Sequence, residues 1–175
     1  MVHAGSGGGT RRAGTGRVEK GEDMASNSQV LVILGSPRKR GNSAALAAQV
    51  ARGAKKAGAS VETVYLHGLR IAPCTGCMKC QREGAKGCVI HDDMQTVYRL
   101  MKEAQAWVIA SPVYWFTVSA QLKIWMDRCL AFTSYTPDAF TSKRIAIAMS
   151  YGGEDPFDSG CVNALRTFQD AYAYV

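Results

Sequence analysis

The segment "VLVILGSPRKRGNSAALAAQVARGAKK", residues 30–56, decides the fold class. It opens with five consecutive apolar residues, which is typical of a strand buried on both faces of a sheet. A polar turn follows, and Asn42 or Ser43 then suits the position that caps the start of a helix. Beyond the cap, apolar residues recur at helical spacing. They are Ala47, Val50, Ala51 and Ala54. The segment therefore predicts a strand, a short loop and a helix.

The rest of the chain continues this alternation. Further strand-like runs lie at residues 60–67, 106–112 and 144–153, and further helical patterns lie at residues 94–104, 118–132 and 161–174. Alternating strands and helices predict an α/β domain, in which helices cover both faces of a parallel sheet. Ligands of such sheets bind beyond the carboxyl ends of the strands. The loops that follow the four strands are therefore the candidate sites.

The loop after the first strand, "GSPRKRGNS" at residues 35–43, has the composition of an anion site. It leads into a helix N-terminus, which offers free backbone N–H groups and the positive end of the helix dipole. Ser36, Asn42 and Ser43 add side-chain donors, and Arg38 adds charge. The loop has neither the Walker pattern nor the G-x-G-x-x-G pattern. It predicts a phosphate site, and the alternative is an ordinary polar turn with a good cap.

From about Gln29 to its end, the chain resembles the flavodoxin-like, NADPH-dependent FMN reductase family. Two motifs carry the resemblance: "GSPR…GNS" after the first strand, and "SPVYWFTVSAQLKIWMDR" at residues 111–128. The resemblance implies a flavodoxin-like three-layer sandwich with a central parallel sheet, bound FMN and electron transfer. The family pattern continues into a final edge strand, which would begin where this sequence stops at Val175. We therefore expect either that the fourth strand forms the edge or that the chain is a fragment.

The resemblance also assigns roles to residues by matching position. It gives the FMN phosphate to Ser36, Arg38, Asn42 and Ser43, the isoalloxazine ring to Pro112, Tyr114, Trp115 and Phe116, and the third flavin loop to Tyr151, Gly152 and Gly153. The residues support these roles independently, because a flat ring favours aromatic neighbours and glycines let the backbone approach it closely. The alternatives are ordinary core packing for the aromatic residues and a plain turn for the glycines.

The segment "PCTGCMKCQREGAKGCVIHDDM", residues 73–94, holds four of the six cysteines: Cys74, Cys77, Cys80 and Cys88. We call residues 73–91 the cysteine loop. Four thiolates can bind a [4Fe–4S] cluster, and C-x-x-C-x-x-C is a spacing that such clusters favour. Lys79, Arg82 and Lys86 lie among the cysteines, and positive charge favours the thiolate form.

The cysteine motif is similar to that of the iron–sulfur flavoprotein branch of the family, which passes electrons between a ferredoxin-like donor and FMN. Two alternatives stay open from the residues themselves. The four thiolates could bind zinc, or the loop could be a metal-free redox or structural element. Because the loop follows a strand of a parallel sheet, we expect it on the same sheet edge as the three flavin loops.

Other reactive residue types have plainer interpretations. Cys129 lies on the apolar side of a predicted helix and suits a small core position. Cys161 begins the last helix, and His67 and His91 flank the cysteine loop as expected surface groups. The pair at residues 92–93 is interpreted as a helix cap.

Composition sets the remaining expectations. The 175 residues suffice for one domain, the net charge is +7, and no apolar run is long enough to span a membrane. The basic residues are scattered and no nucleic-acid motif is present, so we expect neither a nucleic acid nor a membrane as partner. Residues 1–28 are rich in Gly, Ser and Thr and predict disorder. Clustered cysteines in a chain without a secretory signal favour the cytoplasm.

The sequence thus predicts an FMN-dependent oxidoreductase, with a [4Fe–4S] cluster on the cysteine loop and no side chain acting as an essential acid or base. Ferredoxin or NAD(P)H is the expected electron donor, and analogy with the family suggests a homodimer or homotetramer. One alternative is a cluster-free, NAD(P)H-dependent FMN, quinone or azo reductase. The other is a zinc-stabilised, non-catalytic binding module of the same architecture.

Overall fold

The computed structural model describes residues 28–134 and 138–175. The segment predicted to be disordered, residues 1–28, lies outside the described residues except for its last member. No helix in the described ranges combines the length and the apolar character needed to cross a membrane.

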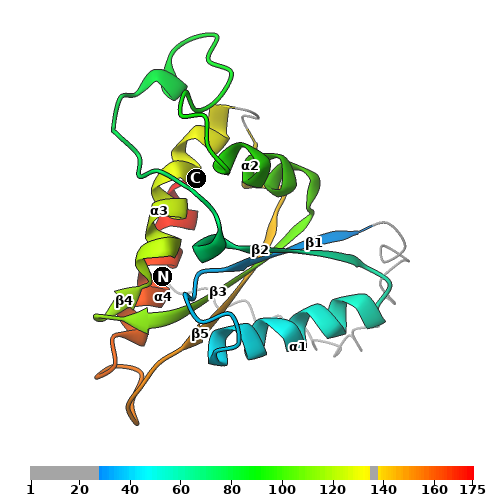
Figure 1. Ribbon diagram of the computed structural model, residues 1–175, viewed down its shortest axis with the longest axis vertical. Coiled ribbons are helices and arrows are strands. Elements are labelled where there is room, and N and C mark those ends of the chain that lie inside the picture. The colour runs from blue at the N-terminus through cyan, green and yellow to red at the C-terminus, as the bar shows by residue number, and fades with distance from the viewer. Residues whose placement is uncertain (1–27, 135–137) are drawn as a thin grey trace, which may run out of the picture.

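The predicted parallel sheet is present (Figure 1). Its parallel strands are β1 (Gln29–Leu34), β2 (Ser60–Tyr65), β3 (Ala106–Tyr114) and β5 (Arg144–Ser150), in the order β2-β1-β3-β5. A fifth, two-residue strand, β4 (Thr117–Val118), pairs antiparallel with the end of β3 and was not predicted. Among the described residues β5 pairs only with β3, so it forms an edge of the sheet.

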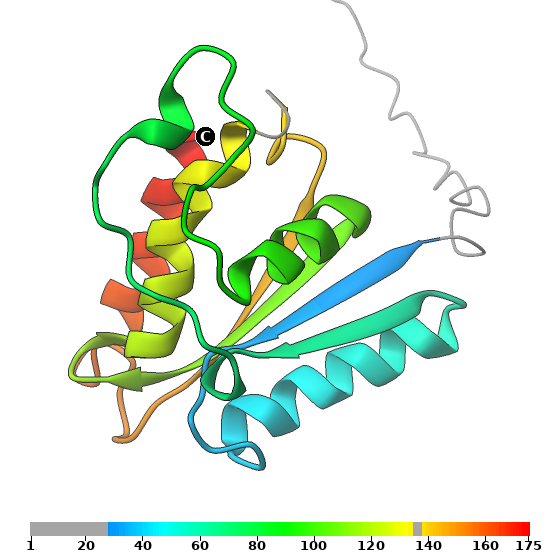
Figure 2. The ribbon, with the colours of Figure 1, turned by 45° about the horizontal axis from the view of Figure 1, so that its top comes forward.

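Within the described part of the chain, four α-helices cover the sheet on its two faces (Figures 1 and 2). They are α1 (Asn42–Lys56), α2 (Met94–Glu103), α3 (Ala120–Arg128) and α4 (Cys161–Tyr174). The same residues also form three short 3-10 helices: η2 (Leu66–Gly68), η3 (Lys79–Gln81) and η4 (Cys129–Ser134). The helix predicted at residues 118–132 is therefore shorter, because its last turn tightens into η4.

The alternation of side chains along β1 explains the layers. Val30 and Val32 pack with Ala47 of α1 in one apolar cluster. Leu31 and Ile33, which point to the opposite face, belong to a larger cluster that α2, α3 and α4 complete. Because helices cover both faces, the interior strands β1 and β3 carry mainly apolar side chains on both sides. The result is the three-layer α/β sandwich that the sequence predicted.

Candidate functional site

The loop between β1 and α1 is fixed by its own short-range hydrogen bonds. The buried Ser36 hydroxyl accepts a bond from the Arg38 N–H (3.0 Å), and the Gly41 N–H donates to the Arg38 carbonyl (3.0 Å). The Tyr65 hydroxyl, at the end of β2, donates to the Pro37 carbonyl (2.6 Å). These bonds give the loop one conformation before any ligand arrives.

The start of α1 fits an anion better than the sequence suggested. Neither Asn42 nor Ser43 caps the helix: the N-cap residue is Gly41, and no side chain among the described residues caps this end. An uncapped helix leaves its first backbone N–H groups without partners, and these groups carry the positive end of the helix dipole. A side chain at position 41 would crowd Arg38, since its Cβ would lie 3.2 Å from the Arg38 Cβ. A glycine at position 41 avoids this crowding.

Ser43 has a different contact from the one expected. It is almost fully buried, and its hydroxyl lies 2.7 Å from the hydroxyl of Ser150 at the end of β5. This hydrogen bond joins the first loop to the loop that follows β5. Two of the predicted site loops are therefore held together by a pair of serines, of which the sequence analysis found only one.

The three adjacent aromatic residues, Tyr114, Trp115 and Phe116, belong to two different elements. Tyr114 is the last residue of β3, whereas Trp115 and Phe116 form the tight turn between β3 and β4. Both turn residues have positive φ (47° and 66°), a conformation that side-chain-bearing residues seldom adopt. Trp115 is 92% exposed.

The turn packs against the start of α4. The Asn163 side chain donates to the Phe116 carbonyl (3.0 Å). Gly160 lies so close that a Cβ there would be 2.4 Å from the Phe116 Cα. The rings of Trp115 and Phe116 are thus held exposed by backbone conformations that cost free energy. Such strained conformations often occur at functional sites.

The ends of β1, β3 and β5 surround a cavity of about 260 Å³, which we call the strand-end cavity. It is lined by Ser36, Arg38, Gly41, Asn42, Ser43, Pro112, Val113, Tyr114, Ser150, Tyr151 and Gly152. The side of the cavity formed by residues 36–43 is polar, and the other side carries Pro112 and two tyrosines. A ligand with an anionic group at one end and a flat ring at the other suits this lining.

Eight of the eleven predicted cofactor residues line this cavity, and Trp115, Phe116 and Gly153 do not. The binding roles of all eleven residues stay predictions. Three lining residues were missed: Gly41, Val113 and Ser150. Gly41 could have been found from the turn it must make before the helix. Ser150 and Val113 carried no local signal, because their place in the cavity follows from sheet order.

The four cysteines of the cysteine loop are free thiols that share one small pocket. This cysteine pocket has a volume of about 30 Å³ and is lined by Cys74, Cys77, Cys80 and Cys88 together with residues of α3 and η4. Cys74 and Cys77 are exposed, and the other two are partly buried. All four cysteines predicted from the sequence line this pocket, and their role as metal ligands stays a prediction.

The cysteine sulfurs accept hydrogen bonds from nearby N–H groups. The N–H groups of Gly76 and Ile90 each lie 3.5 Å from the sulfur two residues earlier, at Cys74 and Cys88. The Gln81 amide lies 3.5 Å from the Cys80 sulfur. The N–H of Lys79 and, to a smaller extent, the hydroxyl of Thr75 stabilise the Cys77 thiolate and lower the pKa of that thiol. At Cys77 the thiolate is therefore favoured, and this is the form that binds metals.

A buried ion pair lies beside the cysteine pocket. Arg128, at the end of α3, is 1% exposed and donates to both carboxylate oxygens of Asp92 (2.7 and 3.1 Å). Burial alone would lower the pKa of Arg128, but Asp92 foremost, with smaller effects of Tyr98 and the Cys88 thiolate, raises it above its ordinary value. Asp92 also accepts the N–H of Met94, the first residue of α2 (3.1 Å), although the N-cap residue itself is Asp93, whose side chain does not cap the helix. The sequence analysis missed Arg128, which lies in an ordinary-looking helical pattern.

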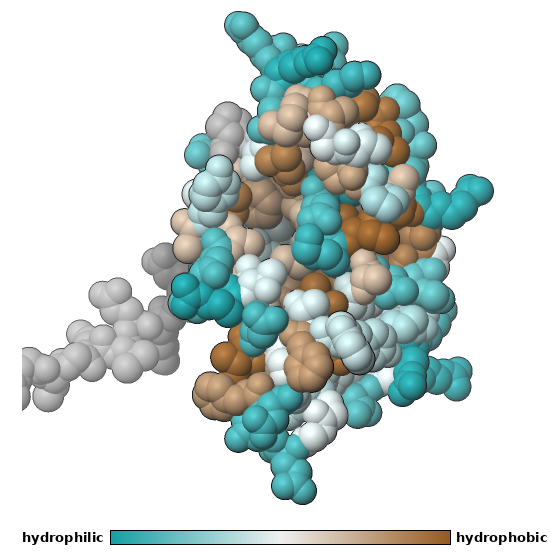
Figure 3. All heavy atoms as spheres, turned by 90° about the vertical axis from the view of Figure 1, so that its left-hand side faces the viewer, coloured by the Kyte–Doolittle hydropathy of each residue, from teal (hydrophilic) through white to brown (hydrophobic). Residues whose placement is uncertain are grey.

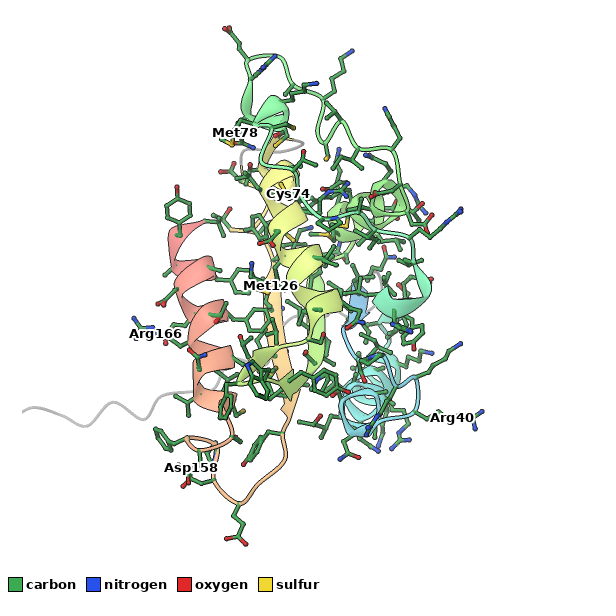
Figure 4. All side chains as sticks on the ribbon, turned by 60° about the vertical axis from the view of Figure 1, so that its left-hand side comes forward. Arg40, Cys74, Met78, Met126, Asp158 and Arg166 are labelled. Carbon is green, nitrogen blue, oxygen red and sulfur yellow. The ribbon has the colours of Figure 1, made fainter. Side chains whose placement is uncertain are left out.

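The cysteine pocket is not on the sheet edge that carries the strand-end cavity, so that expectation was wrong. After β2 the chain begins at the expected edge, where His67 lies 3.2 Å from Gln121 in the first turn of α3. It then runs along α3 until Ala72 meets Arg128 at the other end of the helix. Figure 4 shows the consequence: Cys74 and Met78 lie at one end of the molecule, and Arg40 and Asp158 lie at the other.

The two cysteines outside the loop are unlike the four inside it. Burial raises the pKa of Cys129 and of Cys161, so both thiols are stabilised in the neutral form. Cys129 begins η4 and packs against the larger apolar cluster, in agreement with a core role. Cys161 is the first residue of α4, as predicted.

Comparison with known proteins places these features in context. Residues 28–171 match the family model described as NADPH-dependent FMN reductase. An iron–sulfur flavoprotein of Archaeoglobus fulgidus is 41% identical over 100 residues, which are 57% of this chain and 44% of that protein. An iron–sulfur flavoprotein of Methanocaldococcus jannaschii is 33% identical over 144 residues, 82% of this chain and 70% of that protein. The chain thus spans about half the length of the first relative and a larger share of the length of the second.

Solved structures agree on the fold. An azoreductase from Bacillus anthracis superposes with a TM-score of 0.62 at 17% sequence identity, over 84% of this chain and 81% of its own. At that identity the likeness concerns architecture alone. It supports the flavodoxin-like arrangement of the sheet and helices.

Proposed function

Because the chain belongs to the NADPH-dependent FMN reductase family, we propose that it is an FMN-dependent oxidoreductase whose flavin occupies the strand-end cavity. One observation carries the proposal: an uncapped helix start and a pair of tyrosines face the same cavity of about 260 Å³. A flavin supplies hydride and one-electron chemistry when bound, and the protein supplies binding and orientation.

The chain's own residues divide that task. Ser36, Arg38 and the first N–H groups of α1 would hold the phosphate, with Arg38 adding a charge-assisted bond. Pro112, Tyr114 and Tyr151 would line the ring, and the backbone at Gly152 would approach its edge. No carboxylate or histidine lines the cavity within the described residues, so we assign no essential acid or base to a side chain.

Comparison of FMN with riboflavin tests this assignment. The variant Arg38→Ala with Ser36→Ala should bind FMN more weakly, because each charge-assisted hydrogen bond contributes roughly 1.5–3 kcal/mol. Riboflavin, which lacks the phosphate, should bind parent and variant about equally in a fluorescence titration. The matched control is Arg40→Ala, since Arg40 is exposed in the same loop and does not line the cavity. If the double variant lost riboflavin as strongly as FMN, the loop would not be a phosphate site.

We further propose that Cys74, Cys77, Cys80 and Cys88 hold a [4Fe–4S] cluster. The shared pocket and the N–H groups directed at the sulfurs support this. The matched relatives named iron–sulfur flavoproteins support it too. In the described ranges, no three His, Cys, Asp or Glu side chains are close enough to hold a single metal ion. A [4Fe–4S] cluster allows the four sulfur atoms to lie farther apart than a zinc ion does, because each thiolate binds a different iron atom.

A cluster-free flavin reductase that takes electrons from NAD(P)H is the second candidate. The observation in its favour is the separation of the two sites, which lie at opposite ends of α3. The nine residues of α3 alone span about 13 Å at 1.5 Å per residue. A single chain therefore keeps the cysteine pocket away from the flavin phosphate loop. Activity with NAD(P)H that persists after loss of the cysteines would favour this candidate.

We also propose that copies of the chain associate through the aromatic turn. Trp115, Phe116 and Phe157 are exposed by 92%, 55% and 74%. Apolar surface is visible at this lower end of the molecule in Figure 3. The rings of Trp115 and Phe116 lie 6.1 Å apart, and exposed apolar side chains that gather on one surface often mark interfaces. Sedimentation of the parent and of Trp115→Ser would test the contact, and an unchanged mass would exclude the turn from it.

A further inference from the structure

Arg128 holds the base of the cysteine loop. One guanidinium nitrogen donates to the Ala72 carbonyl (2.8 Å) and to Asp92, and the other donates to Asp92 and lies 3.4 Å from the Ile90 carbonyl. Ala72 precedes the first of the four cysteines by two residues, and Ile90 follows the last by two. One side chain from α3 therefore binds the backbone on both sides of the cysteine-bearing segment.

Neighbouring groups complete this base. Asp92 accepts the N–H of Ala72 (2.8 Å), so the ion pair fixes both polar groups of that residue. The Tyr98 hydroxyl donates to the Arg128 carbonyl (2.7 Å) from the α2 side. The arrangement connects the end of α3, the start of α2 and the two ends of the loop. Beyond it, the Gln95 side chain donates to the Cys88 and Ile90 carbonyls (3.2 and 2.8 Å), and the Gln81 side chain donates to the Leu130 carbonyl of η4 (3.0 Å).

The same arginine reaches the cysteines. Arg128 is one of the residues that line the cysteine pocket, together with all four loop cysteines. Its Nε is buried and has no hydrogen-bond acceptor among the described residues. A buried donor without a partner costs roughly 1–3 kcal/mol of stability, so an arginine in this position needs an explanation. An anionic cluster in the pocket would offset this cost, because the guanidinium is always positively charged and would attract it.

We propose that Arg128 is a positioning residue for the cysteine loop, which holds the four thiolates ready for a [4Fe–4S] cluster and gives the cluster a buried positive neighbour. This inference rests on the proposed cluster. Reduction adds negative charge, so a nearby cation makes the reduced cluster more favourable and raises its reduction potential. A purely structural ion pair would hold the fold without changing that potential.

Two substitutions separate the two roles of the arginine. Arg128→Lys keeps the charge but loses the fork that reaches Asp92 and two carbonyls at once. Arg128→Met keeps a long, unbranched side chain but loses both the charge and the fork. Arg166→Lys and Arg166→Met are matched controls, because Arg166 pairs with Asp170 at the same distance (2.7 Å) on an exposed helix surface.

The first measurement uses the full chain without iron. Thiols are labelled with a maleimide under native conditions and located by mass spectrometry. In both Arg128 variants, Cys80 and Cys88 should react several-fold faster than in the parent, while the buried Cys161 stays protected. Fast labelling of Cys161 as well would mean that the variant unfolds, and Arg128→Lys then decides as the milder change. Unchanged labelling in a folded variant would overturn the loop-holding role.

The second measurement follows reconstitution with iron and sulfide under anaerobic conditions. Loss of a residue that supports metal ligands commonly lowers affinity about 10- to 100-fold, and we expect a loss in this range for both Arg128 variants. The fraction of Arg128→Met that takes up a cluster should have a more negative midpoint potential, whereas Arg128→Lys should stay near the parent. An unchanged potential in Arg128→Met would overturn the charge role. Failure of the parent itself to bind iron would instead overturn the proposed cluster, and with it the premise.

Discussion

The two ends of α3 hold their loops by different means. At its start, the Ser119 hydroxyl caps the helix and donates to the Gly35 carbonyl, so backbone and short side chains are in direct contact. At its end, the long side chain of Arg128 reaches across to backbone on both sides of the cysteine loop. The first arrangement is rigid and needs no ligand. The second leaves two cysteines exposed and depends on one buried ion pair, to which the side chains of Gln81 and Gln95 add hydrogen bonds.

This difference predicts that a substitution at one of the two proposed cofactor sites leaves the other site unaffected. The strand-end cavity is built on strand ends and a helix start, which other contacts fix. The cysteine pocket is built on a loop whose base is one ion pair. Damage at one end of α3 should therefore leave ligand binding at the other end intact, and each prediction below probes one end.

Cys77→Ala should have the largest effect. With one of four thiolates missing, the protein should lose its iron after reconstitution, while FMN affinity changes less than about twofold because Cys77 does not line the strand-end cavity. Iron content and FMN titration measure the two responses. Cys129→Ala is the control and should keep both cofactors. Full iron retention by Cys77→Ala would show that the loop does not use this thiol as a ligand.

Asp92→Asn should strongly destabilise the cysteine end. It leaves Arg128 buried without its counter-charge, and such half-pairs cost about 3–5 kcal/mol. Burial alone would raise the pKa of Asp92, but the hydrogen bonds from Arg128 foremost, and from the N–H groups of Ala72 and Met94, lower it below 3.8. The carboxylate therefore contributes stability above about pH 4, and this contribution disappears as pH falls through the lowered pKa.

Urea unfolding at several pH values measures this contribution. The parent should lose stability as pH falls below about 4, and Asp92→Asn should lose less over the same range. Asp170→Asn, in an exposed pair, should cost no more than about 1 kcal/mol at neutral pH. Parallel acid profiles for parent and Asp92→Asn would contradict the role of the buried pair.

Gly35→Ala tests the other end with an intermediate effect. The added Cβ would lie 2.8 Å from the Leu122 Cβ, so α3 or the end of β1 must shift, at a cost of about 1–3 kcal/mol. Gly53→Ala in α1 is the matched control, because nothing lies within 4 Å of its added Cβ. It should stabilise the protein by about 0.5–1 kcal/mol. Equal effects of the two substitutions on the urea midpoint would refute the close approach.

Trp115→Gly should have the smallest effect on stability. The change relieves a positive φ of 47° but frees the unfolded chain, so the free energy of unfolding should change by less than about 1 kcal/mol in either direction. A loss above 2 kcal/mol, measured by urea unfolding, would mean that the exposed ring contributes packing that the turn geometry does not reveal.

Much of the fold followed from the sequence because its signals are local. The apolar run of β1 and the helical spacing of α1 predicted their elements, and the position of Ser36 and Arg38 at a strand end predicted their cavity. Other features depend on tertiary geometry. The placement of the cysteine pocket could not be predicted, because the rule for strand ends does not say how far a long loop travels. Arg128 was missed for the same reason, since its partners lie 36 to 56 residues away.

The most direct test of the central claim is the absorption spectrum of the protein purified and kept without oxygen. The account predicts flavin bands with a broad iron–sulfur shoulder, and addition of FMN and of iron with sulfide should restore either component that purification removed. A preparation that stays colourless after these additions would contradict the assignment of both sites.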